Sequence, residues 1–138
     1  MPALWPDMMR RWQPGWEPAH PILVVLVEDD PLVRDLFAEM LAEHGHHVVA
    51  CRDGDEGLAA LPDSGERVML LTDVALPGRS GRALADEFHR RHPGQPVLFA
   101  TGLPGDRLPP LRKDEALLRK PFLISEMLAT VDRLAAAA

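Results

Sequence analysis

Beyond Pro21, the chain alternates between short continuous apolar runs and longer stretches with apolar residues at helical spacing. Continuous runs of this length are typical of strands buried on both faces of a sheet. They predict strands at Ile22–Val27, His46–Cys51, Arg67–Thr72, Pro96–Ala100 and Ala116–Arg119. The intervening stretches predict helices within Pro31–Gly45, Asp55–Leu61, Arg82–His92 and Ile124–Ala138.

Strands that alternate with helices predict an α/β fold whose parallel sheet is covered on both faces. The stretch 103–115 departs from this rhythm, because it contains Pro104, Gly105, Pro109 and Pro110. A proline inside a helix costs about 3 kcal/mol. The fourth helix of the series is therefore expected to be short or absent.

Residues 1–21 are predicted to form an extension, and residues 22–138 the domain. The extension holds all three tryptophans and five prolines, a density that forbids a long helix. Tryptophans bury large apolar areas or anchor partners. The extension could pack over apolar surface left by the poor fourth helix, or it could be a disordered tail.

Composition narrows the classes of function. A chain of 138 residues suggests one domain, and a net charge of −6 with a pI near 5.4 argues against direct nucleic-acid binding. The single cysteine, Cys51, allows no internal disulfide and fits a reducing, cytoplasmic compartment. No apolar run reaches the length that spans a membrane.

Polar residues follow the predicted strands at the edge where parallel sheets bind ligands. Glu28 and Asp29 follow the first strand and Asp73 follows the third. Converging carboxylates repel one another unless a cation intervenes, and Mg²⁺ prefers such oxygen ligands. Alternatively, Asp29 and Asp30 only cap the next helix; Asp30 is the better capping residue, since Pro31 follows it.

Thr101 and Lys120 follow the fourth and fifth strands. A lysine is informative in a chain with thirteen arginines and two lysines, because lysine offers a compact point charge. A divalent cation, an ammonium and a hydroxyl are the groups that stabilise a transferring phosphoryl group, and a carboxylate can accept one. The six histidines fall on helix ends and loops, where we expect them to be solvated.

These residues resemble the receiver domain of two-component response regulators. The stretches that match are "ILVVLVEDDPLVRDLF", "LLTDVALPGRSG", "VLFATG" and "LRKPF", in that order. The resemblance implies a flavodoxin-like fold, a five-stranded parallel sheet in the order 2-1-3-4-5 between helices. The phrase "FATG" is also similar to that of one receiver subgroup, although the aromatic expected soon after it is missing.

The resemblance implies that Asp73 is the phospho-acceptor. Asp29 and Asp73 would bind Mg²⁺ directly, together with the backbone carbonyl of Ala75, and Glu28 would bind it through water. All of these positions carry the residue type that the family pattern requires.

The resemblance also assigns the remaining polar residues. Thr101 would bond a phosphoryl oxygen and Lys120 would pair with the phosphoryl group. Pro77 and Gly78 would form the turn after the acceptor, which a Pro-Gly pair favours on its own chemistry. The family's aromatic switch residue is replaced by Leu117, so the usual coupling through an aromatic ring is in doubt.

The expected function is that of a stand-alone receiver, phosphorylated by a histidine kinase or a histidine phosphotransfer protein. It would bind an unknown output protein or relay the phosphoryl group. A homodimer is a possible oligomeric state. It is not expected to be an enzyme that turns over outside substrates. Its chemistry would be limited to its own phosphorylation from a phosphodonor and slow autodephosphorylation. The alternatives are a phosphorylation-independent scaffold and a small-molecule phosphatase; the latter usually has a second Asp where Ala75 stands.

Overall fold

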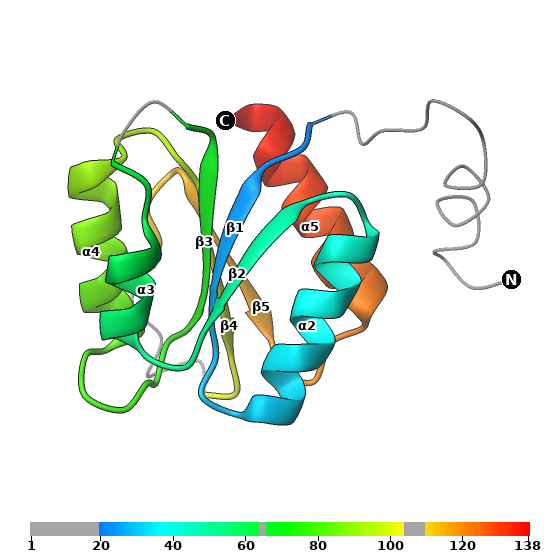
Figure 1. Cartoon of the computed structure of the whole chain (residues 1–138), viewed down its shortest axis with the longest axis horizontal. Helices are drawn as coiled ribbons and strands as arrows, with labels where there is room; N and C mark the ends of the chain where they lie inside the picture. Colours follow the sequence, from blue (N-terminus) through cyan, green and yellow to red (C-terminus); the bar gives the residue numbers. More distant parts are fainter. Residues whose placement is uncertain (1–19, 64–65, 104–109) are drawn as a thin grey trace, which may run out of the picture.

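The fold is a parallel five-stranded sheet between two helical layers, and the structure, a computed structural model, describes residues 20–63, 66–103 and 110–138. The sheet order is β2-β1-β3-β4-β5 (Figure 1). The strands are β1 (Leu23–Val27), β2 (His47–Cys51), β3 (Val68–Asp73), β4 (Val97–Thr101) and β5 (Glu115–Arg119). The predicted fold class and strand order are confirmed.

Helices cover both faces of the sheet (Figure 1). One face carries α2 (Pro31–Glu43) and α5 (Ile124–Ala137), and the other carries α3 (Gly54–Ala60) and α4 (Gly81–Arg91). The central strands contribute side chains to two separate hydrophobic clusters, one under each helical layer. This double burial explains why the strands are continuous apolar runs.

The start and end of α2 follow from local chemistry. The Asp30 carboxylate accepts hydrogen bonds from the backbone N–H groups of Leu32 at 2.9 Å and Val33 at 3.3 Å. Pro31 occupies the first helical position, where no N–H is needed. Gly45 then ends the segment with a φ of 98°, which glycine adopts without strain. Asp30 is therefore a capping residue, as its position before Pro31 predicted.

The described residues between β4 and β5 contain no helix. Gly102–Leu103 and Pro110–Asp114 are turns and irregular backbone, while residues 104–109 lie outside the described part of the chain. The prediction of a short or absent fourth helix agrees with what is described. Most of the predicted extension, residues 1–19, lies outside the described residues as well.

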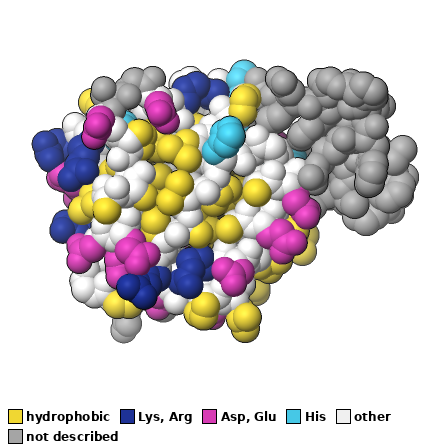
Figure 2. All heavy atoms as spheres, in the orientation of Figure 1, with side chains coloured by type: hydrophobic (Ala, Val, Ile, Leu, Met, Phe, Trp, Pro, Cys, Tyr) yellow, Lys and Arg dark blue, Asp and Glu magenta, His cyan; other side chains and the backbone are white. Residues whose placement is uncertain are grey.

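The β2 strand forms one edge of the sheet. Its exposed residues are His47, Val49 and Ala50, and Val49 is 40% exposed. Figure 2 shows hydrophobic side chains gathered across this edge, with charged side chains around them. The edge is the least covered part of the sheet in this view, since α2 and α3 flank it without closing over it (Figure 1).

The expectation that the histidines are solvated is wrong for most of them. His44, His46 and His92 are 8%, 4% and 4% exposed, and the His89 side chain is 9% exposed. Three of these rings are within hydrogen-bonding distance of carboxylates from distant parts of the chain: His44 and His46 of one on α5, His89 of one on β5. Such long-range partners satisfy a buried imidazole as well as water does.

A buried carboxylate, Glu115, ties the start of β5 to α4. Arg82 donates to its two oxygens at 2.7 and 2.6 Å, His89 lies 2.7 Å away, and the Arg112 amide donates at 2.8 Å. Burial would raise the pKa of Glu115, but these hydrogen bonds outweigh it and lower the pKa to about 2. The Arg82 guanidinium also lies 5.2 Å from the centre of the Phe99 ring.

We expect Glu115→Gln to lower the free energy of unfolding by about 3 kcal/mol at neutral pH, from the depression of its pKa below the ordinary value of 4.5. Because the folded-state pKa is depressed, this stability is present above the unfolded-state pKa and is lost as pH falls towards about 2. Urea unfolding between about pH 7 and 3 measures it. The difference in free energy of unfolding between Glu115→Gln and the wild type should become smaller as the pH falls. Glu39→Gln, which changes an exposed residue of α2, should unfold with the same free energy as the wild type.

Candidate functional site

Three carboxylates converge at the carboxyl edge of the sheet. The paired strands β1 and β3 lie side by side with Val27 opposite Thr72. Glu28 and Asp29 directly follow β1, and Asp73 is the last residue of β3. One carboxylate oxygen from each of the three lies within 4.8 Å of the others. The convergence that the sequence predicted is therefore present in the structure.

Lys120 inserts its ammonium among these carboxylates from the end of β5. Its Nζ lies 2.9 Å from Asp73 Oδ2 and 3.4 Å from each oxygen of Glu28. Its backbone N–H donates to the Thr101 carbonyl at 2.8 Å, and the peptide bond to Pro121 is cis. Burial would lower the pKa of Lys120, but the hydrogen bond to Asp73 and the two carboxylate charges outweigh it and raise the pKa.

Glu28 is the buried member of the cluster, at 4% exposure. Its pKa is raised by burial, and the Asp73 and Asp29 charges add to this effect against the opposing charge of Lys120. One ammonium is thus not enough to balance three carboxylates. An oxygen-rich, under-neutralised cluster of this kind suits a hard divalent cation such as Mg²⁺, so the residues fit the metal that the resemblance implies.

Thr101 and the segment after Asp73 complete the edge. Thr101 is fully buried at the end of β4, and its Oγ1 accepts the Leu103 N–H at 3.0 Å. The Ala75 N–H donates to Asp73 Oδ1 at 3.1 Å, which folds the segment back onto the carboxylate. Three positions after Ala75, Gly78 has a φ of +74° next to the exposed Pro77.

Leu117 lies in the middle of β5, opposite Phe99 of β4. Its side chain is partly buried and packs against the cluster under α3 and α4. It therefore lies on the sheet face that α3 and α4 cover, and it carries no polar tip.

Two supporting residues escaped sequence reasoning. Arg34, on α2, donates from Nη1 to the Glu28 carbonyl at 3.0 Å, which holds the backbone at the end of β1. Gly81 begins α4 against the end of β3, and an ideal Cβ there would lie 2.1 Å from the Asp73 carbonyl oxygen. A glycine in "GRSG" suggests only a turn, so nothing in the sequence announces this close approach.

Comparison with known proteins decides the family. The model of the response regulator receiver domain matches residues 24–132, which is most of the chain. The chain belongs to this family. The receiver domain matched in this way includes every residue of the carboxylate and lysine cluster.

Two relatives bear the names of transcriptional regulators. The chain is 34% identical over 111 residues to the transcriptional regulatory protein TcrA of Mycobacterium tuberculosis, covering 78% of this chain and 44% of TcrA. It is 36% identical over 114 residues to the transcriptional activator PfeR of Pseudomonas aeruginosa, covering 80% of this chain and 37% of PfeR. The chain therefore spans less than half the length of these relatives.

Solved receiver domains share the architecture. The receiver domain of NtrX from Brucella abortus has a TM-score of 0.71 at 28% identity, covering 83% of this chain and 99% of that one. The receiver domain of the hybrid histidine kinase CckA has a TM-score of 0.67 at 25% identity, covering 82% of this chain and 98% of that one.

Among the residues that the structure describes, none of the helices combines the length and apolar character needed to cross a bilayer.

Proposed function

We propose that this receiver domain accepts a phosphoryl group on Asp73 and signals through the phosphorylated form. The observation that carries the proposal is the placement of Lys120 Nζ, 2.9 Å from Asp73 Oδ2, beside a carboxylate cluster that one ammonium does not neutralise. A nucleophilic carboxylate needs its charge balanced when an anionic phosphoryl group approaches.

Asp29, Asp73 and the Ala75 carbonyl would hold Mg²⁺, with Glu28 bound through water. Once bound, the ion would supply positive charge against the phosphoryl oxygens. The buried Glu28 holds Lys120 in place as well, because its oxygens lie 3.4 Å from Nζ. The Ala75 N–H at Asp73 Oδ1 orients the acceptor carboxylate.

In the transfer step, an Asp73 carboxylate oxygen attacks the phosphorus of a phosphohistidine. The new bond is P–O and the bond that breaks is P–N; its electron pair stays on the leaving imidazole, which takes up a proton. Lys120 neutralises part of the charge on the transferred group, and the Thr101 hydroxyl donates to one of its oxygens. The product is an aspartyl phosphate, an acyl phosphate that water slowly cleaves.

The phosphodonor would be a histidine kinase or a histidine phosphotransfer protein, and the phosphorylated form would bind an output protein or pass the group on. Turnover of an outside substrate is disfavoured by Ala75, which leaves no second carboxyl two positions after Asp73 to act as acid or base.

Metal dependence tests the proposal. With phosphoramidate and Mg²⁺, we expect one phosphoryl group to be added to the chain, detected by intact mass, and hydroxylamine to remove it because it is an acyl phosphate. EDTA should reduce the labelling to background, since the uncompensated carboxylates would then repel the donor. A label that survives hydroxylamine, or that forms equally well in EDTA, would contradict the proposal.

A further inference from the structure

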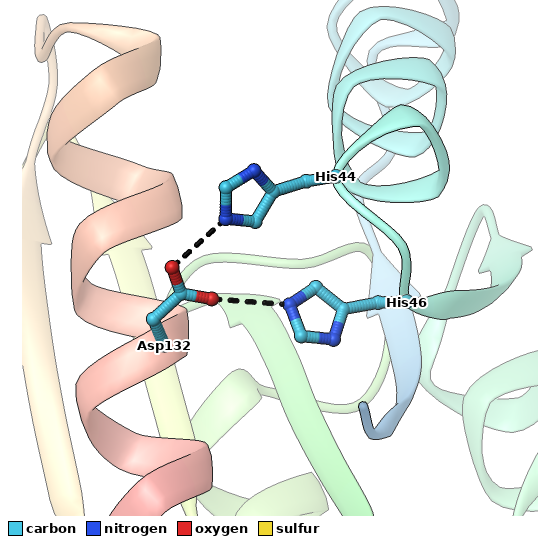
Figure 3. A group of neighbouring side chains, drawn as sticks. All are labelled: His44, His46 and Asp132. Atoms are coloured by element: carbon cyan, nitrogen blue, oxygen red, sulfur yellow. Dashed lines mark hydrogen bonds and ion pairs between the residues drawn. The ribbon is translucent and has the colours of Figure 1, made fainter. Parts of the chain in front are cut away.

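Two buried imidazoles and one carboxylate converge in a second cluster of possible metal ligands (Figure 3). His44 ends α2, His46 leads into β2, and Asp132 points towards both from α5. His44 Nε2 lies 2.8 Å from Asp132 Oδ2, and His46 Nε2 lies 3.3 Å from Asp132 Oδ1. These residues lie near the amino end of β2, whereas Asp73 lies at the carboxyl end of β3.

The carboxylate of this triad is ionised and accessible. Burial would raise the pKa of Asp132, but the hydrogen bonds with His44 and His46 outweigh it and hold the pKa well below its usual range. The Asp132 side chain is 50% exposed, while those of His44 and His46 are 9% and 0% exposed. The two imidazoles therefore form a fixed, buried wall, and the carboxylate opens the cluster to solvent.

We propose that His44, His46 and Asp132 form a second metal site that binds a borderline divalent transition ion such as Zn²⁺. Imidazole and carboxylate are the ligand types that Zn²⁺ takes in proteins, and their ligand atoms here lie within 4.8 Å of one another. The ion would bind the Nε2 atoms of both rings and the Asp132 carboxylate, and solvent on the exposed side would fill the remaining position.

The spacing fits such an ion. Two ligands at the usual Zn–N and Zn–O distances around a tetrahedral centre lie about 3.3 Å apart. The 3.3 Å distance from His46 Nε2 matches this value. The 2.8 Å distance from His44 Nε2 reaches it when the half-exposed Asp132 side chain shifts outwards by about half an ångström. The metal would take the place of the protons that now join the rings to Asp132.

One contact opposes the metal. The Ile22 N–H donates to His46 Nδ1 at 3.3 Å, so the proton of a neutral His46 lies on Nε2, the atom that must bind the ion. Metal binding moves that proton to Nδ1 and gives up the Ile22 bond. The exchange leaves the buried Ile22 N–H without its partner, and this cost lowers the affinity for the ion. The metal–imidazole bond has to outweigh it, which it does at sufficient metal concentration.

The site joins three segments that the sequence separates widely. Asp132 lies 88 positions from His44 and 86 from His46. An ion held there would fasten α5 to the end of α2 and to the edge strand β2, as Figure 3 shows for the hydrogen-bonded triad. Because the ion binds only the folded chain, it should stabilise the domain by mass action.

Zinc titration tests the proposal. The full chain, freed of metal with a chelator, is melted with increasing ZnCl₂ in excess MgCl₂, so that the carboxylate cluster at the strand ends is occupied. We expect the melting temperature to rise by roughly several degrees when the free zinc concentration is about one hundred times the dissociation constant. Asp132→Asn and His44→Gln should weaken the effect at least about tenfold in zinc concentration. His47→Gln, an exposed neighbouring histidine, should leave it unchanged.

Visible absorption of bound Co²⁺ distinguishes the proposed site at His44, His46 and Asp132 from the carboxylate cluster around Asp73. Co²⁺ bound by imidazoles at low coordination number absorbs strongly in the visible range, whereas a six-coordinate, all-oxygen site absorbs weakly. The wild type should show the strong bands and Asp132→Asn should lose them. A zinc effect of equal size in wild type and Asp132→Asn, or no zinc effect in the wild type, would overturn the proposal whatever the outcome of phosphorylation experiments.

Discussion

Asp73→Asn is expected to reduce phosphoryl labelling by a small phosphodonor to background. The amide oxygen of asparagine is a poor nucleophile, and the substitution also removes one of the carboxylates that would hold the metal. Neither Glu28 nor Asp29 substitutes for it, because Glu28 is buried against Lys120 and Asp29 stands outside the Lys120 contacts. A label that persisted in this variant would place the acceptor elsewhere.

The same substitution should leave the fold intact. Without metal, Asp73 adds repulsion to a cluster in which its charge already helps to raise the pKa of Glu28. Lys120 keeps its contacts to Glu28 at 3.4 Å when Asp73 is neutralised. We therefore expect a melting temperature equal to or above that of the wild type in EDTA, and a smaller rise on adding Mg²⁺.

Asp35→Asn is the matched control, since Asp35 is exposed on α2 and stands outside the carboxylate cluster. It should be labelled as fast as the wild type by the small phosphodonor. Loss of label in both variants would point to a general effect of charge and not to Asp73 as the acceptor.

The fold was predictable because its signals are local. Continuous apolar runs of about five residues mark strands buried on both faces, and the observed bounds differ from the predicted ones by about one residue. Val68–Asp73, for instance, replaces the predicted Arg67–Thr72, because Asp73 still pairs with Ala100 of β4. Such shifts depend on the neighbouring strand, which a single run of sequence does not contain.

The convergence of the site was predictable for a geometric reason. In a parallel sheet the carboxyl ends of all strands meet at one edge, so the order of polar residues along the chain indicates which of them lie together. Glu28, Asp73 and Lys120 follow this rule. The roles assigned to them, and the resemblance to the "FATG" subgroup, stay predictions until labelling and structural experiments test them.

Long-range polar pairs were not predictable. His44 and His46 stand where a polar helix end is ordinarily solvated, and only the folded chain brings Asp132 to them. Glu115 and Arg82 likewise lie 33 positions apart. Burial of a charge depends on a partner that no periodicity reveals, so these pairs became visible only with the structure.

Gly81→Ala should destabilise the domain by about 3 kcal/mol, near the upper end of what overpacking costs. The added Cβ would meet the Asp73 carbonyl oxygen at 2.1 Å and the Val74 Cα at 2.9 Å. Both are backbone atoms at the end of β3, so no flexible side chain can give way. The Gly81 N–H also donates to the Val74 carbonyl at 2.9 Å, which holds the start of α4 against that strand.

Gly102→Ala is the matched control, because an ideal Cβ there meets nothing within 4 Å and its φ is not positive. Its free energy of unfolding should stay within about 0.5 kcal/mol of the wild type. Urea unfolding of the two variants in EDTA measures both effects independently of phosphorylation. If Gly81→Ala unfolded like Gly102→Ala, then α4 would not pack on the backbone of Asp73. The position of Asp73, the proposed acceptor, would then be set by β3 alone.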